Sequence, residues 1–379
     1  MSMRYRGVIE RHGKSNYIFF KMEILNLLAK YGDAIVVKTT KNGKPFTIVI
    51  DGGPVSTNEE IASYITNLGY IDLMVLTHYD EDHIGGLLAY FRRFRGKTLP
   101  VGKLWCNCAQ KIDFVDTDIS DAGYRNAGSL AAYLREAQKF NPEFEWREDV
   151  CVPIQENGEM AIRKLDDGDL SITILSPTSE ILSRLKDNYE DYLTKHPMKI
   201  DELQGDKLIA SARGKSDLQS SIDDLAKSDK PRVSNLMNDS SIAFLLEAEG
   251  KKVLLLGDAN PSVVANAIKN IGCALPLKVD LTKVSHHGSK NNISFDLLNV
   301  IDCNKFAFST NGGTGRSYHP DRKTLALILR SSNRKEQPVE FYFNYSLQEI
   351  QQRTDALLKD DEVTEENCKI IDNTVRITL

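Results

Sequence analysis

The chain has 379 residues, 41% hydrophobic and 27% charged, so its apolar side chains suffice for a large core. Its formal charge of −5 excludes an overall positive field, and a nucleic-acid substrate would need a local basic patch or bound metal ions. No stretch approaches the roughly eighteen apolar residues of a membrane-spanning helix, and the charged N-terminus lacks a signal-peptide core. We therefore expect a cytoplasmic protein without membrane contact. Its six cysteines lack zinc or redox spacing and should be reduced, mostly buried thiols.

The first part of the chain predicts a hairpin, two helices and a buried strand. Residues 33–40 and 45–53 form two strand-like runs around the turn KNGK. Residues 57–70 have helical spacing and early glutamates. The apolar run 71–78 is typical of a strand covered on both faces, and a helix follows at 84–94.

The remaining chain alternates strands and helices around a polar segment. The pattern predicts helices at 128–140, 261–272 and 319–329, strands at 168–177, 277–289 and 303–313, a hairpin at 240–260, and one helix and a final strand, 375–379, after residue 345. We expect one domain over residues 1–345, interrupted at about 183–233 by a polar insertion. The tail 346–379 should pack on the same domain.

One short stretch, LTHYDEDHIGGL (76–87), concentrates metal-binding side chains directly after the buried strand. His78, Asp80, Asp82 and His83 place two imidazoles and two carboxylates in one predicted loop, and these are donors that suit zinc, iron or manganese. The glycines at 85–86 allow a tight turn beneath the ions. The alternative is a solvated acidic loop with two incidental histidines. The density of ligand types favours a metal site.

This stretch resembles the H-x-[HD]-x-D-H signature of the metallo-β-lactamase superfamily, in the branch with Asp at the third position. That branch includes the hydrolase domain of the ComEC-type competence protein. Further matching stretches follow in the same order: YGDAIVV, IVIDGG, NDSSIAFLLEAEGKKVLLLGDAN, LTKVSHHGS and STNGG…YHP. The resemblance covers about residues 20–330. It implies an α/β fold, an αββα sandwich of two mixed sheets with outer helices.

The resemblance also implies two divalent metal ions, Zn²⁺ or Mn²⁺. His78 and Asp80 would hold the first ion, and Asp82 and His83 the second. Asp258, at the end of VLLLGDA, would bridge both ions.

The SHHGS stretch would supply the last ligand. His286 would bind the second ion, with His287 beside it facing substrate. Asp51 resembles the aspartate that orders hydrogen bonds around such a site, and Asp33 matches a family position with a structural or supporting role.

The chain departs from many superfamily members because no histidine lies between His196 and His286 to complete the first site. Asn238 and Asp239 stand at the matching place. The first site therefore has few ligands, or it recruits one of these two side chains, which makes manganese plausible.

The implied reaction is hydrolysis by a water activated between the ions, with Asp82 orienting the water. His319 resembles a substrate-side histidine that stabilises a phosphoryl oxygen or protonates the leaving group; the alternative is a solvent-exposed residue at a helix start. Lys290 and Arg316 are candidates for binding a substrate phosphate, although surface Lys and Arg are usually just solvated.

We expect a phosphodiesterase or nuclease. The alternatives are a small-molecule phosphodiesterase, another ester hydrolase of the same fold, or the effector component of a bacterial defence system whose protein partner binds the 183–233 insertion. A further local pattern, FRRFRGK (91–97), could contact a nucleic-acid backbone, but a helix face with its Phe side chains in the core is favoured.

Overall fold

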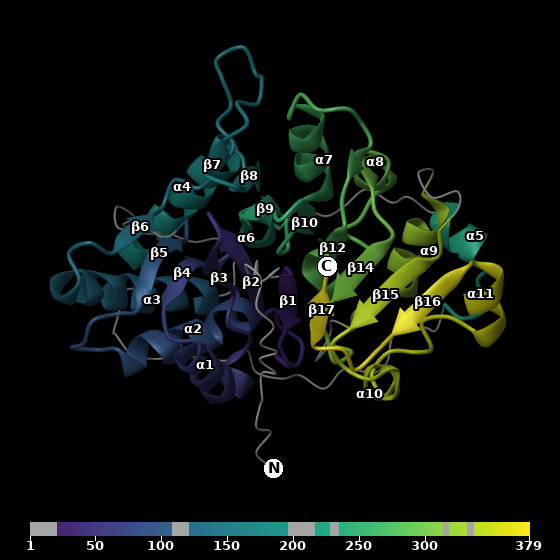
Figure 1. Ribbon diagram of the computed structural model, residues 1–379, viewed down its shortest axis with the longest axis horizontal. Helices are drawn as coiled ribbons and strands as arrows, with labels where there is room; N and C mark the ends of the chain where they lie inside the picture. The colour runs from purple at the N-terminus through teal and green to yellow at the C-terminus, as the bar shows by residue number, and fades with distance from the viewer. Residues whose placement is uncertain (1–20, 108–120, 196–216, 228–234, 314–317, 332–336) are drawn as a thin grey trace, which may run out of the picture.

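The computed structural model describes residues 21–107, 121–195, 217–227, 235–313, 318–331 and 337–379. Its strands form two large mixed sheets that stack face to face (Figure 1). The first sheet has the order β17 (Arg376–Thr378), β1 (Glu23–Asn26), β2 (Ile35–Lys41), β3 (Lys44–Ile50), β4 (Ile71–Val75), β5 (Val101–Trp105), β6 (Glu145–Arg147). The second has the order β16 (Cys368–Ile371), β15 (Val339–Phe343), β14 (Lys305–Phe308), β12 (Leu281–Lys283), β10 (Lys251–Leu255), β9 (Ala243–Ala248), β8 (Leu170–Ser176), β7 (Lys164–Asp167).

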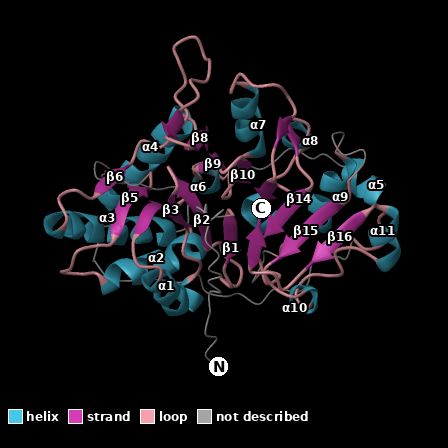
Figure 2. Cartoon of the chain, viewed as in Figure 1, coloured by secondary structure: helices cyan, strands magenta, loops and turns pink. Residues whose placement is uncertain are grey.

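The longer helices lie outside both sheets, as Figure 2 shows in cyan. The longer ones are α1 (Asn58–Asn67), α2 (Glu81–Arg93), α3 (Asp121–Phe140), α4 (Ser179–Lys195), α7 (Pro261–Lys269) and α9 (Arg322–Arg330). The short ones are η1 (Val55–Thr57), α5 (Ile222–Lys227), α6 (Leu236–Asp239), η2 (Ser285–Gly288), α8 (Phe295–Leu298), α10 (Leu347–Gln351) and α11 (Asp360–Glu365). None of the helices in the described ranges is long and apolar enough to cross a bilayer.

The core has three parts that follow from this layering. One cluster lies between the two sheets, where Trp105 of β5 meets Phe244 of β9 with ring centroids 6.4 Å apart. A second joins the first sheet to α1, α2 and α3, and a third joins the other sheet to α7, α8 and α9. The predicted αββα sandwich of two mixed sheets is therefore confirmed.

Most predicted elements are present, with three differences. The single strand expected at 277–289 is two short strands in different sheets, β11 (Leu277–Lys278), which pairs with β13 (Ile301–Asp302), and β12. The tail after residue 345 has two helices and two strands, since β16 extends the second sheet and β17 pairs with β1. The third difference concerns the motif of residues 76–87, whose second half is the first turn of α2 and not a loop.

Several sequence expectations fall partly outside the described residues. Of the expected insertion at 183–233, the structure describes residues 183–195, which belong to α4, and residues 217–227, which include α5. The rest of the insertion lies outside the described residues. Four of the five described cysteines are buried.

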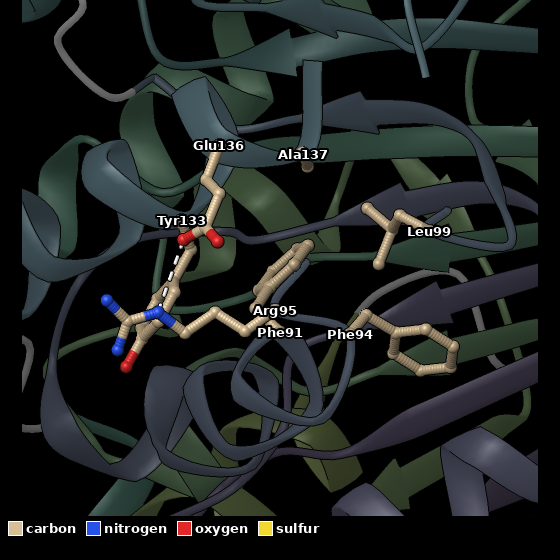
Figure 3. A pocket seen from close by; sticks show the side chains of 7 residues that line it. All are labelled: Phe91, Phe94, Arg95, Leu99, Tyr133, Glu136 and Ala137. Atoms are coloured by element: carbon tan, nitrogen blue, oxygen red, sulfur yellow. Dashed lines mark hydrogen bonds and ion pairs between the residues drawn. The ribbon is translucent and has the colours of Figure 1, made fainter. Parts of the chain in front are cut away.

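Residues 91–97 lie at the C-terminal end of α2, and Phe91 is buried. Figure 3 shows Phe91 and Phe94 lining a small pocket between α2 and α3, where Arg95 pairs with Glu136 at 3.2 Å and lies over the Tyr133 ring. The core interpretation of the Phe side chains is confirmed.

Candidate metal centre

The candidate site lies where strand ends of the two sheets meet. In the first sheet, Asp51 follows β3, and His78 follows β4 three residues after its end. In the second, Asp258 follows β10 and His287 follows β12. All four side chains are buried. Because β3 runs parallel to β4, and β10 to β12, each sheet delivers two of these residues at one edge.

Two glycine pairs bring Asp51 against the start of α2. A Cβ on Gly52 would lie 2.4 Å from the Leu87 nitrogen, and one on Gly86 would lie 2.2 Å from the Gly52 oxygen. This close approach allows the Gly52 N–H to donate to the His83 carbonyl (2.6 Å) and the Gly86 N–H to the Gly52 carbonyl (3.1 Å). The sequence IDGG thus packs on HIGG, and His83 is fixed beside Asp51.

Three imidazoles point their Nε2 atoms into the site. The Nδ1 atom of His83 lies 2.8 Å from Asp51 Oδ2, and that of His287 lies 2.9 Å from the Ser309 carbonyl oxygen. The Nδ1 atom of His78 contacts the hydroxyls of Thr77 (3.1 Å) and Ser241 (3.2 Å). Within the described parts of the chain, the three Nε2 atoms are buried without a hydrogen-bond partner. Partnered Nδ1 and open Nε2 is the arrangement of metal-binding histidines.

Carboxylates complete two adjacent groups of donors. Asp258 places Oδ1 3.5 Å from His83 Nε2 and Oδ2 3.9 Å from His78 Nε2, and Asp80 Oδ2 lies 3.5 Å from His78 Nε2. Asp82 reaches His83 Nε2 (3.9 Å) with one oxygen and His287 Nε2 (3.2 Å) with the other. Donors bound about 2.1 Å from one ion lie ~3–4 Å apart, so these spacings fit divalent metal ions. The described residues contain three overlapping clusters of metal-capable side chains: His78, His83 and Asp258; Asp82, His83 and His287; and Asp33, Asp51 and His83.

His286 and His287 diverge although they are adjacent. Both have left-handed backbone conformations (φ 48° and 54°), which send the two rings in different directions. The His286 Nδ1 atom lies 2.9 Å from the Asn238 amide nitrogen, 3.2 Å from Asn292 Oδ1 and 3.5 Å from Asp258 Oδ2. The ring of His286 contacts that of His319 at 5.3 Å. The structure therefore brings His287, and not His286, to Asp82 and His83.

The other predicted substrate residues lie at the rim. His319 is half-buried, with Nδ1 3.5 Å from Asp321 Oδ2, and Lys290 donates to the other oxygen of Asp321 at 3.0 Å. Asp239 is buried in α6 beside Asn238. Arg316 lies outside the described residues.

Charge interactions between the histidines and aspartates of the cluster shift their pKa values. Burial opposes ionisation of Asp258, but His286 and His83 outweigh it and hold its pKa well below the usual range. Burial would lower the pKa of His287, yet Asp33 and other acidic neighbours raise it to about 10. Burial lowers the pKa of His286 to about 4. A divalent ion would compete with protons for the Nε2 atoms, so binding would release protons.

Four residues that position the candidate donors were not singled out from the sequence. Thr77 donates from both N and Oγ1 to Asp51, and the Ser241 hydroxyl contacts His78. Asn292 donates to the Asp258 carbonyl at 2.7 Å, and Lys283 pairs with Asp33 at 2.7 Å. Only Lys283 carries a sequence signal, a charged residue inside the apolar run LTKVS.

Comparisons with known proteins give one partial sequence match and remote structural likenesses. No family model matches the chain. The ComE operon protein 3 of Bacillus subtilis (strain 168) is 33% identical over 100 residues, which are 26% of this chain and only 12% of that protein.

Three solved structures are remotely similar along nearly the whole chain. Zn(2+)-bound PqqB from Methylobacterium extorquens is 11% identical, with a TM-score of 0.40 over 94% of this chain and 100% of that one. The metallo-beta-lactamase fold protein YhfI from Bacillus subtilis is 11% identical, with a TM-score of 0.38 over 95% and 100%. The long form RNase Z from yeast is 10% identical, with a TM-score of 0.36 over 94% of this chain and 42% of that one.

The fold assignment rests on the chain's own architecture. Two stacked mixed sheets carry helices on their outer faces, and the histidine–aspartate stretch lies where the strand ends of both sheets converge. By these features, the chain has the αββα architecture that its sequence resemblance to the metallo-β-lactamase superfamily implied.

Proposed function

We propose that this chain is a metal-dependent hydrolase that cleaves phosphodiesters, with nucleic acid as the first substrate class. The observation that carries the proposal is the set of buried donors without partners in the described structure, the Nε2 atoms of His78, His83 and His287 and Oδ1 of Asp258. Leaving such atoms unpaired costs about 1–3 kcal/mol each, which bound cations would offset.

The donor groups suggest how two ions would be shared. His78 and Asp80 would hold the first ion, and Asp82, His83 and His287 the second. Asp258 would contribute one oxygen to each, since its two oxygens face His83 and His78 separately. This assignment gives the last ligand of the second ion to His287, in place of the His286 expected from the resemblance.

The donor set is compatible with Zn²⁺ or Mn²⁺. Imidazole suits both ions, while three carboxylates among the donors favour the harder one. We assign neither Asn238 nor Asp239 to the first ion: the Asn238 amide nitrogen already contacts the His286 ring, and Asp239 is its neighbour in α6. The first ion would therefore be held by fewer protein donors than the second.

When bound, the ions would lower the pKa of a water and offset the charge of the phosphodiester. The protein's side chains would orient the water and supply the proton for the leaving oxygen. Asp82 would orient the water through a carboxylate oxygen, and His319, at the half-buried rim beside Asp321, would donate a proton to the leaving oxygen. Lys290 would act on substrate only after leaving Asp321.

The proposal is tested by metal analysis and hydrolysis assays on the same protein. Single- and double-stranded DNA and RNA are offered with Mn²⁺, Mg²⁺ or Zn²⁺. We expect bound metal near two ions per chain and metal-dependent cleavage that the Asp82→Ala/His83→Ala variant loses. The matched control is Asp296→Asn, an exposed aspartate on α8 outside the centre, which should cleave like the wild type.

Bound metal without cleavage of any polymer would refute the nuclease proposal. Small phosphodiesters, such as cyclic nucleotides and bis-p-nitrophenyl phosphate, would then be assayed with the same variants. Absence of bound metal would refute the metal centre itself.

A further inference from the structure

A buried ion pair joins the two sheets next to the candidate centre. Lys283 is the last residue of β12 in the second sheet, and Asp33 lies in the turn between β1 and β2 of the first. Their Nζ and Oδ2 atoms are 2.7 Å apart, and the side chains are only 2% and 1% exposed. Lys283 also donates to the Val284 carbonyl at 3.0 Å.

The pair is connected to the centre through His287. Oδ1 of Asp33 lies 3.3 Å from His287 Nδ1, which donates to the Ser309 carbonyl at 2.9 Å. Both neighbours of Nδ1 are acceptors, so this nitrogen carries a proton, and in the neutral ring the lone pair on Nε2 is the one available to a metal ion. Nε2 faces Asp82 at 3.2 Å. The turn that holds Asp33 is tied to the same segment, since the Ser309 hydroxyl donates to the Gly32 carbonyl.

A buried ion pair adds little net stability to a fold, because desolvation of both charges offsets most of their attraction. The presence of this pair therefore suggests a role other than stabilisation. His83 shows that a buried carboxylate can orient an imidazole without any cation, since Asp51 is satisfied by Thr77 and His83 alone. Among the ion pairs of the described residues, Lys283 is the lysine that pairs with an aspartate of the centre.

Charge balance suggests that role. Five carboxylates surround the centre and carry −5 when ionised: Asp33, Asp51, Asp80, Asp82 and Asp258. Two divalent ions supply +4, and Lys283 supplies the remaining +1. Without the lysine, Asp33 would be a buried charge with no fixed partner beside a ligand histidine.

We propose that Lys283 and Asp33 form a positioning pair that fixes His287 with Nε2 towards the second metal ion. The inference rests on the metal centre of the proposed function and adds Lys283 as a residue that acts on the ion through two others. A pair that merely joined the sheets would affect folding stability and leave the affinity of the folded protein for metal unchanged.

The test measures Mn²⁺ binding by titration calorimetry and thermal unfolding of the metal-free protein. The variants are Lys283→Met and Asp33→Asn/Lys283→Met. Loss of an outer partner of a ligand histidine typically costs 10–100-fold in metal affinity. We expect the second Mn²⁺ to bind about 10-fold or more weakly in both variants, with the first ion little changed. Lys252→Met, a surface lysine of β10 that pairs with Glu247, is the control.

The two variants separate stability from positioning. Lys283→Met leaves Asp33 buried and unpaired, so its melting temperature should fall. The double variant removes both charges and should recover the melting temperature, yet it still lacks the carboxylate beside His287 and should still bind the second ion weakly. Wild-type affinity for the second ion in either folded variant would overturn the inference, as would affinity that recovers together with the melting temperature. Because the readout is ion affinity, a wild-type protein that binds two ions but hydrolyses nothing would count against the proposed function alone.

Discussion

Replacing Gly86 by alanine tests whether close backbone packing holds the candidate centre together. In an ordinary exposed helix, Gly→Ala stabilises by about 1 kcal/mol because alanine has the higher helix propensity. In α2, however, the new Cβ would lie 2.2 Å from the Gly52 oxygen and 2.9 Å from Ile61 Cγ2. Ordinary contact begins near 3.4 Å, so the backbone must move by about 1 Å. We expect the steric clash to cost more free energy than the higher helix propensity of alanine contributes.

The expected magnitude follows from what the movement would disturb. Overpacking in a core typically costs 1–3 kcal/mol. The shift would also weaken the hydrogen bonds that join Gly52 to His83 and Gly86, each contributing ~1 kcal/mol. Subtracting the propensity gain leaves a net loss of about 2 kcal/mol. Since Asp51 precedes Gly52 and contacts His83, metal affinity should fall as well.

Urea unfolding of the metal-free protein measures the loss, and Mn²⁺ titration measures the affinity. Asn266→Ala, on the exposed face of α7, is the control for helix propensity and should be neutral or slightly stabilising. A Gly86→Ala protein as stable as the wild type, with unchanged metal affinity, would refute the argument from close packing.

Three further changes have expected outcomes. His287→Ala should lower the bound Mn²⁺ from two ions to one by elemental analysis, whereas His286→Ala should retain both; the reverse result would return the ligand role to His286. The Tyr90 hydroxyl is buried without a hydrogen-bond partner in the described structure, so Tyr90→Phe should raise stability to urea by ~1 kcal/mol, and a loss would disprove the unpaired state. Burial opposes ionisation of Glu362, but its hydrogen bonds to Arg322 outweigh burial and hold its pKa below 4.5. This stabilisation is present above the unfolded pKa and is lost as pH falls through the lower folded value, so Glu362→Gln should flatten the loss of stability below about pH 4.5, and an unchanged acid profile would contradict the assignment.

Much of the fold could be predicted because its signals are local. Apolar runs with turn residues between them identify β2 with β3, and β9 with β10, and the Asn260–Pro261 pair marks the start of α7. In the tail, the final strand was predicted from its sequence and is present as β17, but its pairing with the distant β1 was not. The four residues of β16 were missed because so short a strand depends on its pairing with β15.

In the candidate site, too, only the features with a local sequence signal could be predicted. The cluster of His78, Asp82 and His83 and the separate Asp258 could be named from residue types at strand ends. The sequence could not predict which of His286 and His287 faces Asp82. That depends on the left-handed backbone conformation of both residues, which two adjacent histidines do not reveal. Asp82 and His83 were expected in a loop because their charges obscured a helix that begins at Glu81, directly after an extended Asp80.

The pairing of β17 with β1 has a consequence for synthesis on the ribosome. β1 can pair with β2 as soon as residue 41 has emerged, but its other side stays open until residues 376–378 arrive. During the translation of more than 330 residues between them, that open side is an unpaired backbone edge to which another nascent chain could add. The first sheet is thus completed late, after every strand of the second sheet has been translated.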